Sequence, residues 1–376
     1  MPGLYLHIPF CARRCPYCDF AVSVNARPQF QANYVAALQI ELKTALQNLE
    51  SPLESVFLGG GTPTQLPAST LNQILATARP HLAPDSEVSL EANPENLDAA
   101  YLRELRRGGW NRLSLGAQSF DAHELQVLGR VHDGAKIENV VRQAKEAGFE
   151  HLSLDLIYGA PGTSLTKWQQ TLRRAVELDV AHLSAYSLTI EDGTAFGRAV
   201  RKGELAAPDD DFLADLMDEA TQILGEAGFG RYEVSNWAKA GFECVHNLNY
   251  WRGGDYLGVG CGAHGHQRGH RFWNERDAKT YIRKIESEGS ARAGEEFLTP
   301  RERASELVAL GLRCREGFEI EQVARIGAFD ARKALNGALS SFVLMGTLRE
   351  EAGRVSPSPQ ALAVADGVAA RLVAHF

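Results

Sequence analysis

Three cysteines stand close together near the start of the chain, in the run Cys11-Ala-Arg-Arg-Cys15-Pro-Tyr-Cys18. Three soft thiolates on one short loop suit the ligation of an iron–sulfur cluster. Because a four-iron cluster has four irons to ligate, three cysteines leave one iron open for chemistry. A structural zinc site would need four ligands, usually in two separated pairs. That zinc site and a chance grouping of buried cysteines are the two alternatives.

Other residues suited to binding follow short apolar runs further along the chain. They include the loops Gly59-Gly-Gly-Thr-Pro63 and Glu91-Ala-Asn-Pro94, and Gln118. Glycines let the backbone approach a ligand closely, and free N–H groups near a helix start can receive a carboxylate. A tight turn without a ligand is the alternative for the glycine run. For each polar residue, the alternative is a buried group that bonds to the backbone.

The elements that would position these residues alternate in type. Short apolar runs of strand length are separated by longer segments of helical periodicity, which is typical of βα units around a parallel sheet. Apolar residues three and four apart predict helices such as Tyr34–Leu46 and Asp98–Leu105. Ligands of such sheets bind at the carboxyl ends of the strands, so the loops should converge on one site. The expected strands are Leu4–Ile8, Ser55–Leu58, Glu87–Leu90, Arg112–Leu115, Leu152–Ile157 and Leu183–Leu188.

Six such units predict an α/β fold with a partial (βα)6 barrel, since a full barrel has eight units. We expect this core domain at 1–235, followed by a Gly- and His-rich connecting segment at 236–275. A smaller, mostly helical C-terminal domain is expected at 276–376. Within it, helices are predicted at Arg301–Leu312 and Phe329–Leu339, and a strand–turn–strand at Leu348–Val355.

Several motifs in the same order resemble those of one family. With the cysteine run, they resemble the oxygen-independent coproporphyrinogen III oxidase family of the radical SAM superfamily, over nearly the whole chain. The resemblance implies a [4Fe-4S] cluster on Cys11, Cys15 and Cys18, with S-adenosylmethionine held against it. The motifs are Tyr5-Leu-His-Ile-Pro-Phe-Cys11, Gly59-Gly-Gly-Thr-Pro63, Leu115-Gly-Ala-Gln-Ser-Phe120, Gly129-Arg-Val-His132 and Asp155-Leu-Ile-Tyr-Gly-Ala-Pro161.

The same resemblance implies which side chains contact S-adenosylmethionine. The polar ones have types that suit ribose hydroxyls, the adenine edge and a methionine carboxylate. The glycines and Thr62 would bring backbone close to the methionine end. The expected residues are Tyr5, Tyr17, Gly60, Gly61, Thr62, Glu91, Gln118, Arg130 and Asp155.

Two features distinguish the oxidases of this family from its heme-chaperone branch. The oxidases have a fourth cysteine two residues after the third, where this chain has Phe20. They also have an extension before the cysteine loop, whereas the loop here begins at residue 11. Both departures favour the heme-chaperone branch.

A histidine motif characteristic of that branch follows at His246-Asn-Leu-Asn-Tyr-Trp251. An imidazole is a common axial ligand of heme iron, and aromatic neighbours could line a flat macrocycle. The alternative is a core or loop histidine. Weaker ligand candidates are Cys244, Cys261 and His264, the last two within Gly258-Val-Gly-Cys-Gly-Ala-His-Gly265, while Cys314 is interpreted as a small core residue.

Composition limits the other possibilities. The 376 residues are 44% hydrophobic and 23% charged, which is ordinary for a globular protein. A net charge of −8 argues against a nucleic-acid partner. No apolar run approaches the roughly 20 residues of a membrane span. Without a secretory leader or a disulfide-like cysteine spacing, we expect a cytoplasmic protein.

The leading hypothesis is a chaperone that binds heme, a [4Fe-4S] cluster and S-adenosylmethionine, and delivers heme to acceptor hemoproteins. The alternative is an oxygen-independent coproporphyrinogen III oxidase that decarboxylates propionates by 5′-deoxyadenosyl radical chemistry. We expect no such oxidase activity, and the sequence identifies no catalytic residue. For S-adenosylmethionine, cleavage and mere stabilisation of a cluster-bound state are both compatible with the sequence.

Overall fold

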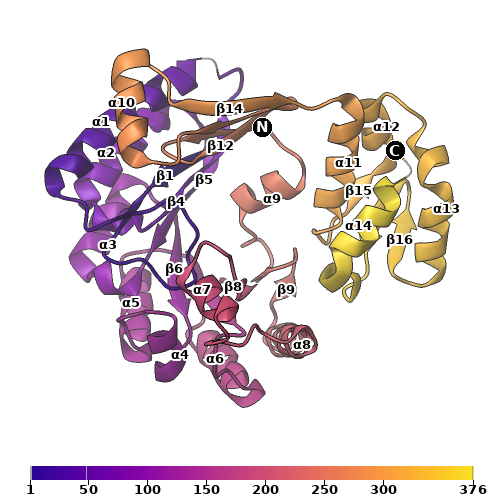
Figure 1. Cartoon of the computed structure of the whole chain (residues 1–376), viewed down its shortest axis with the longest axis horizontal. Coiled ribbons are helices and arrows are strands. Elements are labelled where there is room, and N and C mark those ends of the chain that lie inside the picture. The colour runs from indigo at the N-terminus through magenta and orange to yellow at the C-terminus, as the bar shows by residue number, and fades with distance from the viewer. Residues whose placement is uncertain (1, 48, 375) are drawn as a thin grey trace.

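A computed structural model describes residues 2–47, 49–374 and 376. Figure 1 shows an α/β core and, set apart on the right, a smaller unit that begins after strand β14. The core is built on one sheet of twelve strands in the order β14-β13-β12-β11-β1-β4-β5-β6-β7-β8-β10-β9. The expected α/β class with a mostly helical C-terminal region is therefore confirmed.

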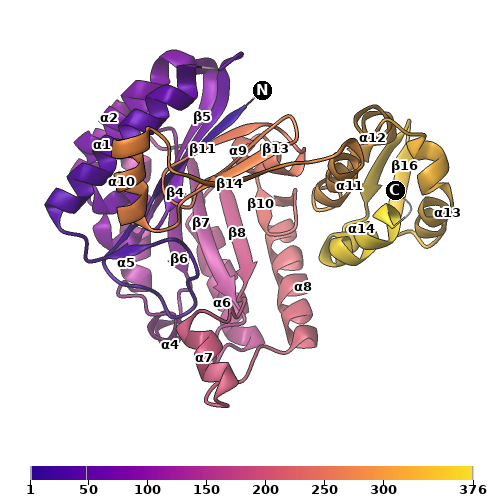
Figure 2. The same ribbon diagram turned by 45° about the horizontal axis from the view of Figure 1, so that its top comes forward.

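All six predicted strands are present and pair in parallel in the order of the sequence. Helices connect them and cover one face of the sheet, as Figure 2 shows for α1 and α2. The strands are β1 (Gly3–Ile8), β4 (Leu53–Gly60), β5 (Leu82–Ala92), β6 (Arg112–Gln118), β7 (His151–Tyr158) and β8 (His182–Ser187). The helices are α1 (Pro28–Gln47), α2 (Ala68–Ala78), α3 (Ala99–Gly108), α4 (Ala122–Val127), α5 (Gly134–Glu146), α6 (Leu165–Glu177), α7 (Ala195–Arg201) and α8 (Asp210–Glu226).

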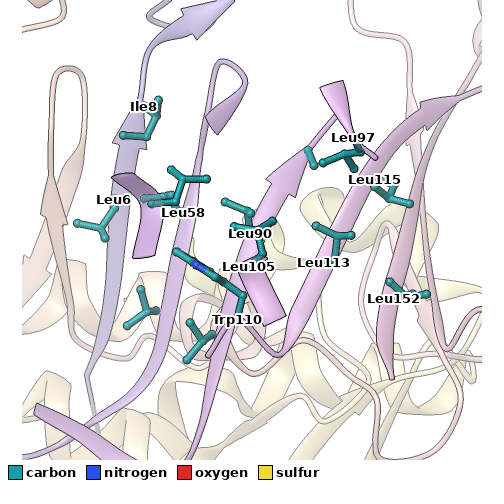
Figure 3. Close-up of a cluster of buried hydrophobic side chains, with 14 of the residues drawn as sticks. Leu6, Ile8, Leu58, Leu90, Leu97, Leu105, Trp110, Leu113, Leu115 and Leu152 are labelled. Atoms are coloured by element: carbon teal, nitrogen blue, oxygen red, sulfur yellow. The ribbon is translucent and has the colours of Figure 1, made fainter. Parts of the chain in front are cut away.

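A continuous apolar layer joins these strands to their helices. Leu58, Leu90 and Leu113 come from three neighbouring strands, and Leu105 of α3 and Trp110 pack against them (Figure 3). All five side chains are completely buried. Burial of this layer is the main force that fixes the strand ends, and with them the loops that follow.

The sheet continues beyond the six predicted strands. Strand β11 (Tyr256–Val259) pairs in parallel with β1, and an antiparallel extension follows it. The expected domain boundary at residue 276 falls inside this extension, because β14 pairs with β13 and α10 packs against α1. We propose that the boundary lies near Leu298. The added elements are β9 (Gly230–Arg231), β10 (Asn236–Ala238), α9 (Val245–Trp251), β12 (His264–Gln267), β13 (His270–Asn274), α10 (Ala278–Glu288) and β14 (Arg292–Phe297).

The C-terminal unit has its own apolar core, which includes Val308, Phe318 and Leu335. A capping box at Thr299 and Glu302 starts its first helix. Its elements are α11 (Pro300–Gly311), β15 (Phe318–Glu319), α12 (Ile320–Gly327), α13 (Ala331–Leu344), β16 (Leu348–Glu351), β17 (Arg354–Pro357) and α14 (Ala365–Val373). A two-stranded sheet, β2 (Phe10–Cys11) and β3 (Ser23–Val24), borders the cysteine loop. Among the described helices, none is long and apolar enough to cross a bilayer.

Candidate cofactor-binding site

A cavity of about 660 Å³ opens where the parallel strands end and the cysteine loop crosses them. The loops therefore converge as expected for this kind of sheet. Of the residues predicted to hold the cluster and S-adenosylmethionine, eleven line this one cavity. They are Cys11, Cys15, Tyr17, Cys18, Gly60, Gly61, Thr62, Glu91, Gln118, Arg130 and Asp155.

The cysteine loop presents its three thiols to the cavity. Cys11 Sγ lies 3.7 Å from Thr62 Oγ1, and Arg130 Nη1 donates to Cys15 Sγ at 3.6 Å. Burial raises the pKa of the Cys11 thiol to about 11, so its deprotonation depends on a bound cation. No group of three or more described His, Cys, Asp or Glu residues is arranged around a single metal ion.

That arrangement still fits a cluster, because three thiolates that each bind a different iron lie further apart than the ligands of one ion. The backbone next to Cys11 is also built for close approach. A Cβ atom at Gly61 would stand 2.9 Å from Cys11 Sγ and 2.8 Å from the Pro9 carbonyl. Glycine at this position thus keeps the space beside the sulfur open.

The glycine run lies at the cavity, but its N–H groups are already bonded. Gly60 donates to Glu91 Oε2 at 3.1 Å, Gly61 to the Ile8 carbonyl and Thr62 to the Phe10 carbonyl, both at 2.8 Å. The carboxylate that the Gly60 amide receives is that of Glu91, and the binding of a ligand carboxylate by this loop stays a prediction. The Gly61 and Thr62 amides are used for backbone pairing with the end of β1 and with β2, whereas the Gly60 amide is held by a side chain.

Two half-buried carboxyl groups, those of Glu91 and Asp155, line the cavity. Burial and the nearby Asp155 raise the pKa of Glu91 to about 8, so Glu91 is mostly protonated near neutral pH. Burial also raises the pKa of Asp155, and hydrogen bonds from Ser184 and Ser114 oppose that rise. Ser114 donates to both Asp155 oxygens, at 3.0 and 2.9 Å. A carboxyl and a carboxylate side by side can accept and donate toward ribose hydroxyls.

Gln118 ends β6 in a conformation that few residues adopt. Its φ of +65° lies in the left-handed region, at a register shift between Gly116 and Gln118. Such strain concentrates at functional sites. Gln118 lines the cavity at this point.

Asn93 lies in the loop Glu91-Ala-Asn-Pro94 and is a further residue of the site, to which the sequence motifs assign no role. Asn93 Nδ2 donates to Thr62 Oγ1 at 2.9 Å, and Arg130 donates to Asn93 Oδ1. Asn93 therefore links the glycine loop to the guanidinium at Cys15. Its place in Glu91-Ala-Asn-Pro94, directly after a buried strand, could have indicated from the sequence that it belongs to the site.

Two predicted residues lie outside this cavity. Tyr5 borders it from a neighbouring space, and its hydroxyl lies 3.0 Å from His7 Nδ1. His246 lines a small inner cavity of about 150 Å³ that shares Glu91, Ser114 and Asp155 with the first. His246 and the cysteines thus line two different cavities, and the three shared residues belong to both.

His246 is completely surrounded by the core. Its Nδ1 lies 2.8 Å from Ser55 Oγ and its Nε2 lies 2.8 Å from the Tyr250 hydroxyl. The ring stacks on Phe57 with centroids 5.2 Å apart. Burial lowers the pKa of His246 to about 4, so the ring is neutral and both nitrogens are engaged.

A larger cleft, of about 1200 Å³, runs between the β12–β13 hairpin and the C-terminal unit. Tyr5, Gly60 and Glu91 line its inner end, and Gly60 and Glu91 also line the cysteine cavity. The hairpin supplies one wall, and Leu307 and Ile326 of the C-terminal unit supply the other. This cleft adjoins the candidate cofactor site. Tyr250 of the histidine motif and His264, a weaker ligand candidate from the sequence, both line it.

Comparisons with known proteins agree with this geometry. A model of the Radical SAM superfamily matches residues 5–175, and a model of the HemN C-terminal domain matches residues 298–364. The solved structure of coproporphyrinogen III oxidase (HemN) from Escherichia coli is similar with a TM-score of 0.86. It is 23% identical and covers 100% of this chain and 91% of that chain, a likeness that shows the fold alone.

Heme chaperone HemW of Mycobacterium tuberculosis (strain ATCC 25618 / H37Rv) is 42% identical over 337 residues, which are 88% of this chain and 86% of that protein. Heme chaperone HemW of Bacillus subtilis (strain 168) is 37% identical, with 86% of each chain covered. Fold and site define a radical SAM protein, a class that implies a [4Fe-4S] cluster and S-adenosylmethionine. Within that class, the chain belongs to the family of heme chaperone HemW.

Proposed function

We propose that this protein binds heme and delivers it to acceptor hemoproteins, and that it carries a [4Fe-4S] cluster and S-adenosylmethionine. The observation that carries the proposal is the pair of adjoining spaces. A cavity lined by the three cysteines meets a much larger cleft along Gly60 and Glu91. The HemW relatives support heme as the occupant of the larger space.

In this proposal Cys11, Cys15 and Cys18 ligate three irons. A bound cluster would supply reducing electrons and one iron with an open coordination position. Arg130, which donates to Cys15, would offset the negative charge of the thiolates. The cysteine loop and the glycine loop together would exclude water from the cluster.

The remaining cavity residues would hold S-adenosylmethionine. Glu91 and Asp155 would bind the ribose hydroxyls, and Gln118 the adenine edge or the hydroxyl beside it. Tyr17, Gly60, Gly61 and Thr62 would enclose the methionine end, and Arg130 would pair with its carboxylate. Tyr5 would contact the cofactor from the inner end of the cleft.

His246 contributes to heme binding by positioning Tyr250 in this proposal. Its Nε2 holds the Tyr250 hydroxyl, and Tyr250 lines both the inner cavity and the cleft. Direct ligation of iron by His246 would first have to break this bond or the one to Ser55. Direct ligation therefore stays a prediction from the motif alone.

The decisive experiment measures heme uptake and transfer in one sample and decarboxylation of coproporphyrinogen III in another. Anaerobically reconstituted protein is incubated with heme and then with an apohemoprotein, and heme in the acceptor is measured by its absorption spectrum. A parallel sample receives coproporphyrinogen III, reductant and S-adenosylmethionine. We expect stable heme uptake and transfer with no protoporphyrinogen. Protoporphyrinogen formation without heme uptake would establish the oxidase alternative instead.

A further inference from the structure

Three histidines line the large cleft, namely His7, His264 and His266. Two of them have both ring nitrogens engaged. His7 contacts the Tyr5 hydroxyl and the Ala21 carbonyl, and His266 contacts the Gly254 carbonyl and the Gly269 amide. An iron ligand needs a nitrogen lone pair free. These two rings would have to break existing hydrogen bonds to provide one.

His264 differs from both of them. Its side chain is exposed in the cleft, and among the described residues no hydrogen-bond partner occupies its ring. The ring stacks on Trp273, its cross-strand partner on β13, with centroids 5.9 Å apart and planes 26° apart. One face of the ring is thus in contact with the indole, and both ring nitrogens are without a hydrogen-bond partner among the described residues.

The position of the Trp273 indole depends on a glycine on the next strand. Gly294 of β14 is the partner of Trp273, and a Cβ there would stand 2.3 Å from the indole. The indole therefore lies across Gly294, in a row with His264 over three strands. A row of this kind limits the directions that the imidazole can take.

The opposite wall of the cleft carries a cation without a partner. Arg271 pairs with Glu296 and Glu306, and Arg276 pairs with Asp19. Arg303 of α11, which is half-buried in the same cleft, has no ion pair within the part of the chain that the structure describes. Its side chain lies against Gly269, in the turn at the far end of the hairpin from His264. A carboxylate ligand would satisfy this guanidinium.

We propose that heme binds in this cleft with His264 as an axial ligand of the iron and Arg303 as the partner of a propionate. The proposal rests on the proposed function and assigns the heme site within it. The iron ligand stands on the hairpin wall, and the cation reaches from the facing wall to the turn at the far end of the hairpin, which matches a macrocycle with iron at its centre and propionates at its edge. Leu307, Leu310 and Ile326 offer apolar surface to the ring from the other side.

The test begins with anaerobic heme titrations of the reconstituted full chain, followed by absorption, EPR and resonance Raman spectra. In His264→Ala we expect the histidine-ligated signature to disappear, while cluster content and S-adenosylmethionine affinity stay at the wild-type level. Exogenous imidazole should restore the signature in His264→Gly. His270→Ala is the matched control, because His270 lies on the same hairpin outside the cleft. Its spectra should equal those of the wild type.

Two outcomes separate this assignment from the proposed function. If the wild type does not bind heme, the proposed function fails and this site fails with it. If the wild type binds heme and His264→Ala gives unchanged spectra, only the assignment of His264 is overturned. Should His264→Ala fold poorly, His264→Met keeps the test sharp, since a thioether ligand gives a different spectrum from an imidazole. A wild-type spectrum in folded His264→Met would also overturn the assignment.

The role of Arg303 has its own readout. The wild type should bind heme about tenfold more tightly than heme dimethyl ester, which lacks carboxylates, and Arg303→Ala should abolish that preference. A preference that stays unchanged in Arg303→Ala would remove Arg303 from the site.

Discussion

At the scale of single residues, the cysteine cavity places thiols beside groups that affect their ionisation. Cys11 is buried enough to raise its thiol pKa to about 11, and Cys15 receives a hydrogen bond from Arg130. Thiols in this setting ionise when a metal binds, so cluster binding and proton release are coupled. Under the proposed ligation each cysteine is needed separately, because no fourth cysteine of the loop could replace a lost one.

Cys15→Ala should therefore abolish the cluster, since two thiolates cannot hold a site designed for three. Iron and sulfide per chain after anaerobic reconstitution are the measure. Cys314→Ala is the matched control, because Cys314 is buried far along the chain and its thiol contacts the Tyr232 carbonyl. Wild-type iron and sulfide in Cys15→Ala would show that the ligands are elsewhere.

Asp155→Ala and Gln118→Ala should weaken S-adenosylmethionine binding and leave the cluster in place. The loss of one charge-assisted hydrogen bond costs about 1.5–3 kcal/mol, which is roughly ten- to a hundredfold in affinity. Anaerobic calorimetric titration measures the change, and iron content serves as the control. Unchanged affinity in both variants would exclude these side chains from the cofactor site.

At the scale of elements, α9 is held by buried polar contacts more than by its own length. Glu87 of β5 accepts from the N–H groups of Val245 and His246 at its start, at 3.0 and 3.2 Å. His246 then bonds to Ser55 of β4 and to Tyr250 one turn later. The histidine motif thus fixes α9 against the sheet and places Tyr250 at the cleft.

His246→Ala should lower the free energy of unfolding by about 2–4 kcal/mol, because it leaves a cavity and two partners without hydrogen bonds. The heme signature should remain if His246 only positions Tyr250. Urea unfolding and heme spectra of the same preparation test both statements. Loss of that signature in a folded His246→Ala protein, with imidazole rescue, would instead support direct ligation.

The low pKa of His246 also predicts a dependence of stability on pH. The folded ring titrates at about 4, and an unfolded histidine at about 6.5. Between these values the unfolded chain binds the proton more strongly, so stability is full above pH 6.5 and falls as the pH is lowered. The slope is about 1.4 kcal/mol per pH unit. In His246→Gln the slope of the free energy of unfolding against pH should be smaller by this amount. Equal slopes in the variant and the wild type would contradict the pKa assigned to His246.

The local pattern was enough to predict the six parallel strands and the loops that carry the cavity residues. Apolar periodicity is a property of neighbouring residues. The carboxyl ends of parallel strands lie at the same edge of a sheet, so the loops that follow them lie close together. The pattern could not predict that β11 joins β1, because that pairing links distant segments. It also missed that the Gly60 amide bonds to Glu91, and it left a heme-ligating and a core position for His246 as alternatives. Those facts depend on tertiary packing.

At the scale of the whole molecule, the two cofactor-sized spaces draw on different parts of the chain. Every residue of the cysteine cavity lies at or before Glu191, whereas the cleft needs residues up to Ile326. The two largest apolar cores are separate as well, one in the sheet and one in the C-terminal unit. The C-terminal unit therefore affects the cleft far more than the cysteine cavity.

A chain that ends at Leu298 should keep cluster content and S-adenosylmethionine affinity within about twofold, but release heme about tenfold faster or more, because the wall with Arg303 is gone. Stopped-flow transfer of heme to apomyoglobin measures the release rate. Full-length Leu310→Glu disturbs the same wall without removing a core and should act in the same direction. Heme release at the wild-type rate in both proteins would mean that this wall of the cleft does not help to retain heme.

The position of β1 in the sheet has a consequence for synthesis. Its partner on one side, β4, is made soon after it, but its other partner, β11, begins only at Tyr256. During translation the β1 edge next to the cysteine loop is therefore open while most of the core already exists. Open edges invite wrong pairing, and late long-range pairing slows folding. Completion of the sheet must therefore wait until the segment with β11 has been made.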